Sequence, residues 1–261
     1  MLHLLSVPRI SSRAGKVWYR NFLVFVQTWK VNFFPPFIDA LLYLFAIGMG
    51  IGTYIKEVDG VPYINFIAPA ILAISVMNSA FFECTYGSYV RMYYQKSFDA
   101  MIATPLSIED VIAGELLWGA TRSVLYVAIM LPVLAAFGVI SLPLSLLALP
   151  LAFLGGLMFA GIGMCITAIT PSIDSLNYPM FLFITPMMLF SGTFFPLALL
   201  PAAFQYIAVA LLPLTHIVSI MRMFTLPALS WTILLHVTWI AAVTVIFCVM
   251  SINLMKKRLI V

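Results

Sequence analysis

Six long apolar segments dominate the pattern of hydrophobic and polar positions along the chain. They cover residues 37–55, 64–90, 114–139, 144–169, 177–195 and 230–254. An α-helix needs about 20 mostly apolar residues to cross the hydrocarbon core of a bilayer, and each segment is close to that length or longer. The pattern therefore predicts an all-α integral membrane protein with six transmembrane helices, folded as one transmembrane domain over residues 1–261.

The first 34 residues have a different pattern, in which basic residues alternate with apolar ones. Large apolar residues recur there at spacings of three and four, which places them on one face of a helix. These residues are Trp18, Phe22, Phe25, Val26 and Trp29. A basic helix with aromatic residues on its apolar face is typical of the membrane interface. Residues 1–34 are therefore predicted to form an amphipathic interfacial helix that Pro35 and Pro36 end.

A second irregular segment, residues 196–229, precedes the last span. It is apolar, but prolines interrupt it at positions 196, 201, 213 and 227. Its apolar run 202–212 is too short to cross a bilayer, and a stretch of this length is typical of a re-entrant or interfacial segment. We expect residues 196–229 to form a re-entrant segment on the external side.

Composition and charge agree with this interpretation and set the orientation. The chain is 64% hydrophobic and 8% charged, against about 25% charged in soluble domains, so a soluble globular fold is excluded. With the N-terminus inside, ten Lys and Arg residues fall on the inner side and two on the outer side. Positive residues collect on the cytoplasmic side. Both termini and the 91–113 loop are thus predicted to be cytoplasmic, and the net charge of +4 implies topology rather than a nucleic-acid partner.

The cysteines and histidines do not indicate a metal site or a disulfide. Cys84, Cys165 and Cys248 all lie inside apolar runs, and none belongs to a CxxC motif or has a histidine at ligand spacing. We interpret them as small buried apolar residues.

The 91–113 loop predicts a short amphipathic helix along the cytoplasmic surface. Phe98, Met101 and Ile102 form an apolar face, and Thr104 and Pro105 end the helix. Ser107 can cap the next helix, with Asp110 at its third position. Two interpretations stay open here. The loop is either a solvated connector or a docking helix for a cytoplasmic partner, since helices with an apolar face and mixed charges bind in grooves of other proteins.

Two blocks of sequence resemble the permease subunits of ABC-2-type exporters, and among them the nodulation-type lipo-oligosaccharide exporters. The first block comprises Asn78-Ser79-Ala80-Phe81-Phe82-Glu83, Arg91-Met92, Phe98-Asp99-Ala100, Ala103-Thr104-Pro105-Leu106-Ser107, Glu109-Asp110-Val111 and Gly114-Glu115. The second comprises Pro186-Met187-Met188-Leu189-Phe190-Ser191-Gly192-Thr193-Phe194-Phe195-Pro196, Leu200-Pro201, Phe204-Gln205, Pro213-Leu214-Thr215-His216 and Arg222. The blocks stand in the family's order. One departure is Asp99, where wider relatives often carry Glu.

The resemblance implies a permease of the bacterial inner membrane that works with a second copy of itself and two separate ATPase subunits. ATP and Mg²⁺ would be bound by those subunits, with no cofactor in this chain and no enzymatic activity of its own. The sequence itself contains no G-x-x-x-x-G-K-[ST] phosphate loop. The family's contact with the ATPase would fall, besides the N-terminal helix, on Arg91, Phe98, Asp99, Met101, Thr104 and Pro105.

The cargo that the resemblance implies is an amphipathic, lipid-linked or lipid-modified oligosaccharide. The alternative keeps the fold and exports a drug, an antibiotic or another lipid. A membrane enzyme is disfavoured because the acidic residues are scattered, and a passive channel would leave the docking helix without a partner.

Two ionisable residues are predicted inside spans, at similar depth. Glu83 in the second span and Arg122 in the third each lie roughly 10 Å from the cytoplasmic end, at 1.5 Å per residue. Because an ionisable group in a membrane is costly, a partner is expected. We hypothesise that the two residues pair; the alternative is that each reaches the interface or meets water in a cavity.

The outer end of the fifth span is predicted to form an external gate. Ser191, Gly192 and Pro196 interrupt the helix there, and a broken helix at membrane depth is tolerated only where protein or water covers it. The predicted gate also includes Phe194, Phe195 and His216.

Overall fold

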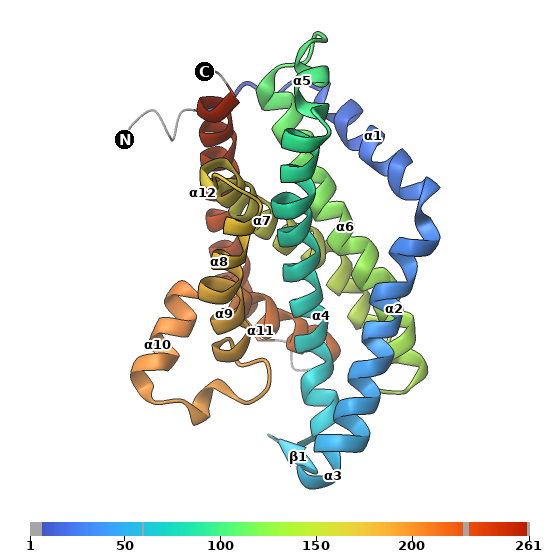
Figure 1. Cartoon of the computed structure of the whole chain (residues 1–261). Coiled ribbons are helices and arrows are strands. Elements are labelled where there is room, and N and C mark those ends of the chain that lie inside the picture. The colour runs from blue at the N-terminus through green and yellow to red at the C-terminus, as the bar shows by residue number, and fades with distance from the viewer. Residues whose placement is uncertain (1–6, 59, 227–229, 260–261) are drawn as a thin grey trace.

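The computed structural model describes residues 7–58, 60–226 and 230–259, and these are almost wholly helical. The exception is a short antiparallel hairpin of β1 (Glu57–Val58) and β2 (Val61–Pro62), in which Glu57 lies opposite Pro62. Figure 1 shows α5, the start of α1 and the end of α12 at one end of the molecule, and β1 with α3 at the other.

The helices differ widely in length. The α-helices are α1 (Ala14–Gln27), α2 (Trp29–Phe45), α3 (Gly52–Tyr54), α4 (Tyr63–Phe82), α5 (Ser97–Ile102), α6 (Ile108–Ala136), α7 (Ala148–Ile169), α8 (Asn177–Pro179), α9 (Thr185–Phe190), α10 (Ala202–Leu211), α11 (Pro213–Thr225) and α12 (Thr232–Leu259). π-Helical segments are η2 (Ala46–Ile51), η3 (Glu83–Gly87), η4 (Val90–Tyr94) and η7 (Met180–Ile184). 3₁₀ turns are η5 (Leu144–Leu147), η6 (Asp174–Leu176) and η8 (Leu197–Leu199).

Four helical segments of the described chain are long and apolar enough to cross a membrane. They are Tyr63–Tyr94, Ile108–Ala136, Leu144–Ile169 and Thr232–Leu259. A fifth is added if α10 and α11, which meet at 90°, count as one broken span. The predicted spans at 64–90, 114–139, 144–169 and 230–254 coincide with the four. The predicted spans at 37–55 and 177–195 fall on helices outside this set, so the count of six stays a prediction.

The predicted end of the N-terminal helix is wrong. The helix breaks at Thr28, where the backbone leaves helical geometry, and α2 continues through Pro35 and Pro36. The Thr28 hydroxyl donates to the carbonyl of Val24 at 2.9 Å, and Asn32 Nδ2 donates to the Thr28 carbonyl at 3.0 Å, so side chains add to the backbone bonds that cross the break. The two prolines, of which Pro35 is exposed and Pro36 is buried, each lack an amide proton and so remove a helical hydrogen bond without ending α2.

The buried face of α1 also differs from the predicted one. Ala14, Val17 and Asn21 are buried, whereas Val26 and Trp29 are exposed. Contact with α6 explains the shift, because Gly114 of α6 has no side chain there. A Cβ at position 114 would lie 2.5 Å from Val17 Cβ and 2.7 Å from the Ala14 carbonyl oxygen. The first helix is thus packed against the bundle through Gly114.

The centre of the bundle is α7, which contacts α4, α6 and α12. Its buried positions include several small residues, as close helix packing in membranes requires. At Gly161, for example, a Cβ would lie 3.1 Å from the backbone of Phe247 and Cys248 in α12.

The loop between α4 and α6 contains the predicted short helix, here α5. The loop is shorter than predicted, since η4 extends to Tyr94 and α6 begins at Ile108. The predicted cap is confirmed. Ser107 Oγ accepts from the Asp110 amide at 3.1 Å, and Asp110 Oδ2 accepts from the Ser107 amide at 3.3 Å, which completes a capping box.

Candidate functional site

Four ionised side chains join three helical segments in the interior; we call Glu83, Arg91, Glu115 and Arg122 the ion network. Arg91 Nη1 lies 2.7 Å from Glu83 Oε1, and Arg91 Nη2 lies 2.5 Å from Glu115 Oε2. Arg122 Nη1 pairs with Glu83 Oε2. The structure therefore brings together the two residues expected to pair across spans, Glu83 and Arg122, and adds two more.

Neutral donors complete the bonding of the two carboxylates. Trp118 Nε1 donates to Glu83 at 3.1 Å, Asn21 Nδ2 donates to Glu115 at 2.8 Å, and Ser88 Oγ donates to Glu115 at 3.0 Å. Both carboxylate side chains are almost fully buried. A buried charge that loses its partner costs about 3–5 kcal/mol, so each member constrains the others.

Local backbone geometry helps to converge these groups. Glu83 lies on η3 and Arg91 on η4, two π-helical segments separated by Ser88 and Tyr89. Single π turns inside α-helices are uncommon and occur frequently at functional sites. Gly87, the last residue of η3, leaves room for the Glu83 and Arg91 side chains, since a Cβ there would lie 3.2 Å from Glu83 Oε1 and 3.4 Å from Arg91 Nη1.

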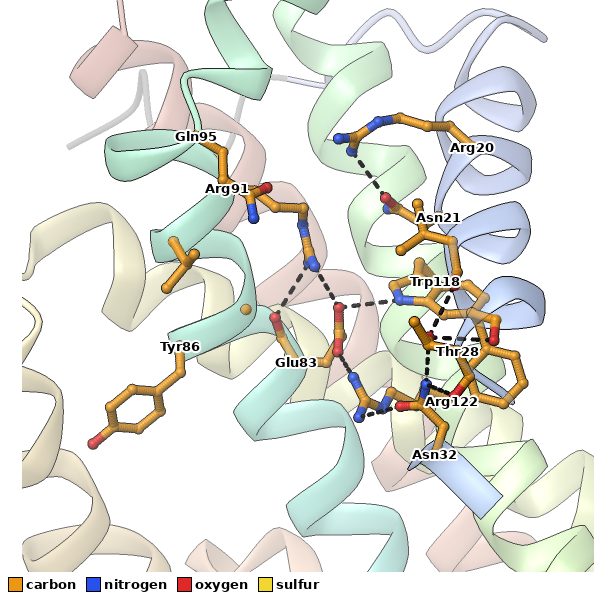
Figure 2. Close-up of a pocket in the computed structure, with 14 residues that line it drawn as sticks. Arg20, Asn21, Thr28, Asn32, Glu83, Tyr86, Arg91, Gln95, Trp118 and Arg122 are labelled. Atoms are coloured by element: carbon orange, nitrogen blue, oxygen red, sulfur yellow. Dashed lines mark hydrogen bonds and ion pairs between the residues drawn. The ribbon is translucent and has the colours of Figure 1, made fainter. Parts of the chain in front are cut away.

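A cavity of about 460 Å³ opens beside the ion network; we call it the α1–α4 cavity. Figure 2 shows Glu83 and Arg122 at its floor and Arg20 and Gln95 nearer the end that carries α5. Its lining also includes Asn21, Val24, Phe25, Thr28, Asn32, Tyr86, Gly87, Val90, Arg91 and Trp118. A second cavity of about 250 Å³ shares Glu83, Gly87 and Arg122 with it. Polar space therefore follows the side of α4 that faces α1 and α2.

The residues predicted to contact an ATPase separate into two groups. Asp99, Thr104 and Pro105 are exposed at the end of the molecule that carries α5, where a partner could reach them. Phe98 is fully buried and Met101 is partly buried, so they hold α5 on the bundle. The prediction that Phe98 touches the partner is corrected, because its side chain points into the core.

Arg91 needs the same correction. Its side chain is 15% exposed and is bonded to Glu83 and Glu115, not to solvent at the tip. Because η4 leads directly into the α5 loop, Arg91 connects that loop to the interior charges.

The turn at residues 191–196, which we call the external turn after its predicted side of the membrane, contains five of the predicted gate residues. Gly192 has φ +71°, a conformation that favours glycine. Arg222 Nη2 of α11 donates to the Gly192 carbonyl at 2.6 Å, and Tyr63 Oη donates to the Phe194 carbonyl at 3.1 Å. The Ser191 side chain is buried, whereas Phe194, Phe195 and Pro196 are partly exposed. The turn is therefore tied to α4 and α11.

His216 does not join the external turn, which corrects the predicted gate. Its Nε2 lies 2.9 Å from the Val209 carbonyl, its Nδ1 lies 2.8 Å from His236 Nδ1, and its ring stacks on Trp239 at 4.0 Å. The carbonyl can only accept, so His216 Nε2 carries a proton, and in a neutral pair His236 Nδ1 donates to His216 Nδ1. His216 thus connects α10, α11 and α12.

Glu115 and Asn21 are members of the site that reasoning on the sequence left without a role. Glu115 could have been found by the argument applied to Glu83, since it is an acidic residue within an otherwise apolar run. Asn21 gave no comparable signal, because an asparagine in a basic amphipathic helix is expected to face water.

Comparison with known proteins adds an independent line of evidence. The ABC-2 type transporter family matches residues 15–226. The chain is 36% identical to Nodulation protein J of Rhizobium leguminosarum bv. viciae, over 93% of this chain and 93% of that protein. It is 34% identical to Nodulation protein J of Rhizobium meliloti, over 99% and 98% of the two chains.

A more distant relative is the inner membrane transport permease YadH of Escherichia coli, at 26% identity over 84% of this chain and 83% of that protein. No solved structure matches the chain significantly. The family match covers most of the chain, including the ion network, α5 and the external turn. The alignments to the two Nodulation protein J relatives cover nearly the whole length of both proteins. The chain therefore belongs to the ABC-2 type transporter family.

Proposed function

We propose that the chain is the permease subunit of an ATP-driven exporter in the bacterial inner membrane, carrying a lipo-oligosaccharide or another lipid-linked glycan outward. The observation that carries this proposal is the placement of α5 within an ABC-2 fold. In this short helix the Asp99 side chain is exposed, and the buried Phe98 side chain packs the helix onto the bundle. The helix lies at the end of the molecule where many of the charged residues lie. The cargo follows from the resemblance to nodulation-type exporters and from the Nodulation protein J relatives.

Energy would enter at α5 from a separate ATPase. The chain lacks a phosphate loop, so a second protein must supply ATP and Mg²⁺ binding. Asp99, Thr104 and Pro105 offer polar and backbone groups at the tip of the molecule. Two ATPase subunits would each press on one copy of α5.

The path from α5 to the interior is short and rigid. Arg20 Nη2 of α1 donates to Ser97 Oγ of α5 at 3.2 Å, and Arg13 Nη1 pairs with the Pro105 carbonyl. Asp110 accepts the Ser11 amide at 2.6 Å. These bonds connect α5 and the start of α6 to α1 and the residues just before it, so the three would move together, and Arg91 would pass the movement to Glu83 and Glu115.

Movement of the ion network would change how α4, α6 and α1 sit against one another. Tyr86 on η3 donates to Asn177 Oδ1 of α8 at 2.8 Å, so the same segment also reaches the helices before the external turn. A push at the cytoplasmic end could therefore alter both the passage and the external turn. The permease supplies path and selectivity and makes no covalent bond.

A second copy of the chain would complete the passage. α2 and the α8–α9 region, on either side of α4 in Figure 1, present exposed apolar side chains. Phe34 and Leu42 of α2 are exposed, as are Phe181 and Leu182 near α8. Such faces suit lipid or a second subunit, and the family's dimeric assembly favours the second for at least one of them.

The proposal is tested by purifying the tagged chain from its native host in a mild detergent and identifying what travels with it. We expect one ABC ATPase at equal stoichiometry, a dimer of the tagged chain, and ATP hydrolysis by the complex. A monomer without an ATPase would refute the exporter assignment. Lipid extracts of the medium, compared between wild-type and deletion strains, then identify the cargo: loss of a secreted glycolipid supports the proposed class, and loss of a drug or a simple lipid replaces it.

A further inference from the structure

The α1–α4 cavity contains more positive charge than its ion pairs neutralise. Arg20, Arg91 and Arg122 line it, and Glu83 is its one lining carboxylate. Glu115 lies behind Arg91 and neutralises one further charge. Three guanidinium groups against two carboxylates leave one positive charge facing the cavity.

Arg20 is the residue whose charge is uncompensated. Its Nη1 donates to Asn21 Oδ1 at 3.1 Å and its Nη2 to Ser97 Oγ at 3.2 Å, both neutral acceptors. It takes part in none of the four ion pairs found among the described residues. A partly buried guanidinium with neutral partners can still form a charge-assisted hydrogen bond with an anion, which is about twice as strong as a neutral one.

The floor of the cavity offers a second donor. Arg122 lines this floor, and its Nη2 donates to the neutral Asn32 Oδ1 at 3.3 Å. Its Nη1 pairs with Glu83, and Tyr126 also contacts the guanidinium, with its ring 5.7 Å from the guanidinium carbon. An anion in the cavity could replace the neutral Asn32 oxygen and accept a charge-assisted hydrogen bond from this guanidinium.

The surroundings of the cavity suit an amphiphile. The stretch of α1 that includes the lining residue Val24 exposes large apolar side chains. Leu23 is 43% exposed, Val24 52% and Val26 47%. A molecule with a charged headgroup and acyl chains could place its headgroup between Arg20 and Arg122 and its chains along this surface.

We propose that the α1–α4 cavity binds a phosphate group, with Arg20 at the mouth and Arg122 at the floor as its donors. The exposed apolar surface of α1 favours the headgroup of an anionic lipid over a soluble phosphate as its source. This inference goes beyond the proposed function, since such a lipid can hold the ion network in place whatever the cargo is.

Native mass spectrometry of the full-length chain, released from detergent in the absence of any ATPase or cargo, tests the proposal. The probes are phosphatidylglycerol, phosphatidylcholine and inorganic phosphate. The informative variant is Arg20→Gln, which removes the unneutralised charge from a partly exposed position. The matched control is Lys16→Gln, which makes the same charge change at an exposed position of α1 outside the cavity lining.

We expect the wild-type chain to retain phosphatidylglycerol in preference to phosphatidylcholine. Arg20→Gln should weaken that binding by about tenfold, the loss of one charge-assisted hydrogen bond, and Lys16→Gln should not. Displacement of the lipid by inorganic phosphate would support the phosphate site with a soluble source, and resistance to it would support the lipid source. Equal retention of the two lipids, or equal effects of the two substitutions, would overturn the proposal. Thermal unfolding of each variant serves as the control that both remain folded.

Discussion

Glu83 and Arg122, 39 residues apart in the sequence, form an ion pair that joins η3, directly after α4, to the middle of α6; the carboxylate is buried and the guanidinium partly exposed. The pair is not isolated, because Arg91 binds the other oxygen of Glu83 and continues to Glu115. Two carboxylates and two guanidinium groups therefore alternate along one chain of contacts. This arrangement explains how four ionised residues are stable in a protein with 8% charged residues.

The first prediction concerns the coupling between Glu83 and Arg122. Arg122→Gln leaves Glu83 paired with Arg91 alone, and Glu83→Gln leaves the partly exposed Arg122 without a carboxylate. Each should lower the free energy of unfolding in detergent by less than the loss of about 3–5 kcal/mol expected for a fully unpaired buried charge. The double variant should lose about 1–3 kcal/mol less than the sum of the two. Strictly additive losses would show that the pair contributes no interaction of its own. Exchange of the two charges should restore only part of the stability, since Arg91 would then face a like charge.

A second prediction concerns Arg91 as the link between the α5 loop and the interior. Arg91→Lys keeps the charge but replaces a planar group that spans two carboxylates with a single ammonium. We expect the ATPase subunit to bind normally while ATP-driven transport falls by about tenfold, a coupling loss of about 1.4 kcal/mol. Lys56→Arg, a charge-preserving exchange at an exposed position outside the ion network and the α1–α4 cavity, is the control. Equal transport by the two variants would remove Arg91 from the route.

The third prediction separates contact from support in α5. Asp99→Lys should weaken ATPase binding by at least about tenfold without lowering stability, because the side chain is exposed at the tip. Phe98→Ala should instead lower the free energy of unfolding by about 3–5 kcal/mol, because it empties a fully buried site. Glu57→Lys makes the same charge reversal at the opposite end and should change neither. Pull-down with the purified ATPase and chemical denaturation provide the two readouts; normal ATPase binding by Asp99→Lys would disprove this role for α5.

A fourth prediction compares the replacement of glycine by alanine at two positions, one packed against α1 and one open. Gly114→Ala should destabilise the protein by about 1–3 kcal/mol, because the new Cβ would collide with Val17 and the Ala14 carbonyl. Gly15→Ala should stabilise it by about 0.5–1 kcal/mol, since that position in α1 has open space and alanine favours the helix. Thermal unfolding measures both. If the two variants shift stability in the same direction, the packing of α1 on α6 is not as described.

The fifth prediction concerns the external turn. Arg222→Ala removes the donor to the Gly192 carbonyl and the guanidinium that lies 3.8 Å above the Phe66 ring. The turn should open more often, and a cysteine reporter introduced as Phe195→Cys should react with a water-soluble maleimide about tenfold faster, a shift of about 1.4 kcal/mol. Lys56→Ala, an exposed cation near β1, is the matched control. Unchanged labelling in the Arg222 variant would show that other contacts hold the turn.

Helix positions were largely predictable from the sequence, because apolar length and capping act locally. Four spans and the Ser107 cap follow from hydropathy and from hydroxyl chemistry. The break at Thr28 was not predictable in the same way, since the two prolines were the stronger local signal and Thr28 itself is a residue that helices tolerate.

Site residues were predictable only where the residue type itself demanded a partner. Glu83 and Arg122 were matched because ionisable groups at similar depth need each other. Arg91, Phe98 and His216 were misplaced because motif position does not show which way a side chain points. The Arg91 side chain points inward to two carboxylates, and the Phe98 side chain is buried in the core. His216 stacks on Trp239 of α12, away from the external turn.

The most direct test of the central claim is ATP-dependent transport by the reconstituted complex. The chain and its ATPase are inserted in liposomes with the ATPase outside, and movement of a labelled lipo-oligosaccharide into the lumen is measured with and without ATP. The account predicts ATP-dependent accumulation that Asp99→Lys abolishes through loss of the ATPase and that Arg91→Lys reduces with the ATPase still bound. Accumulation that is independent of ATP, or unaffected by either substitution, would contradict it.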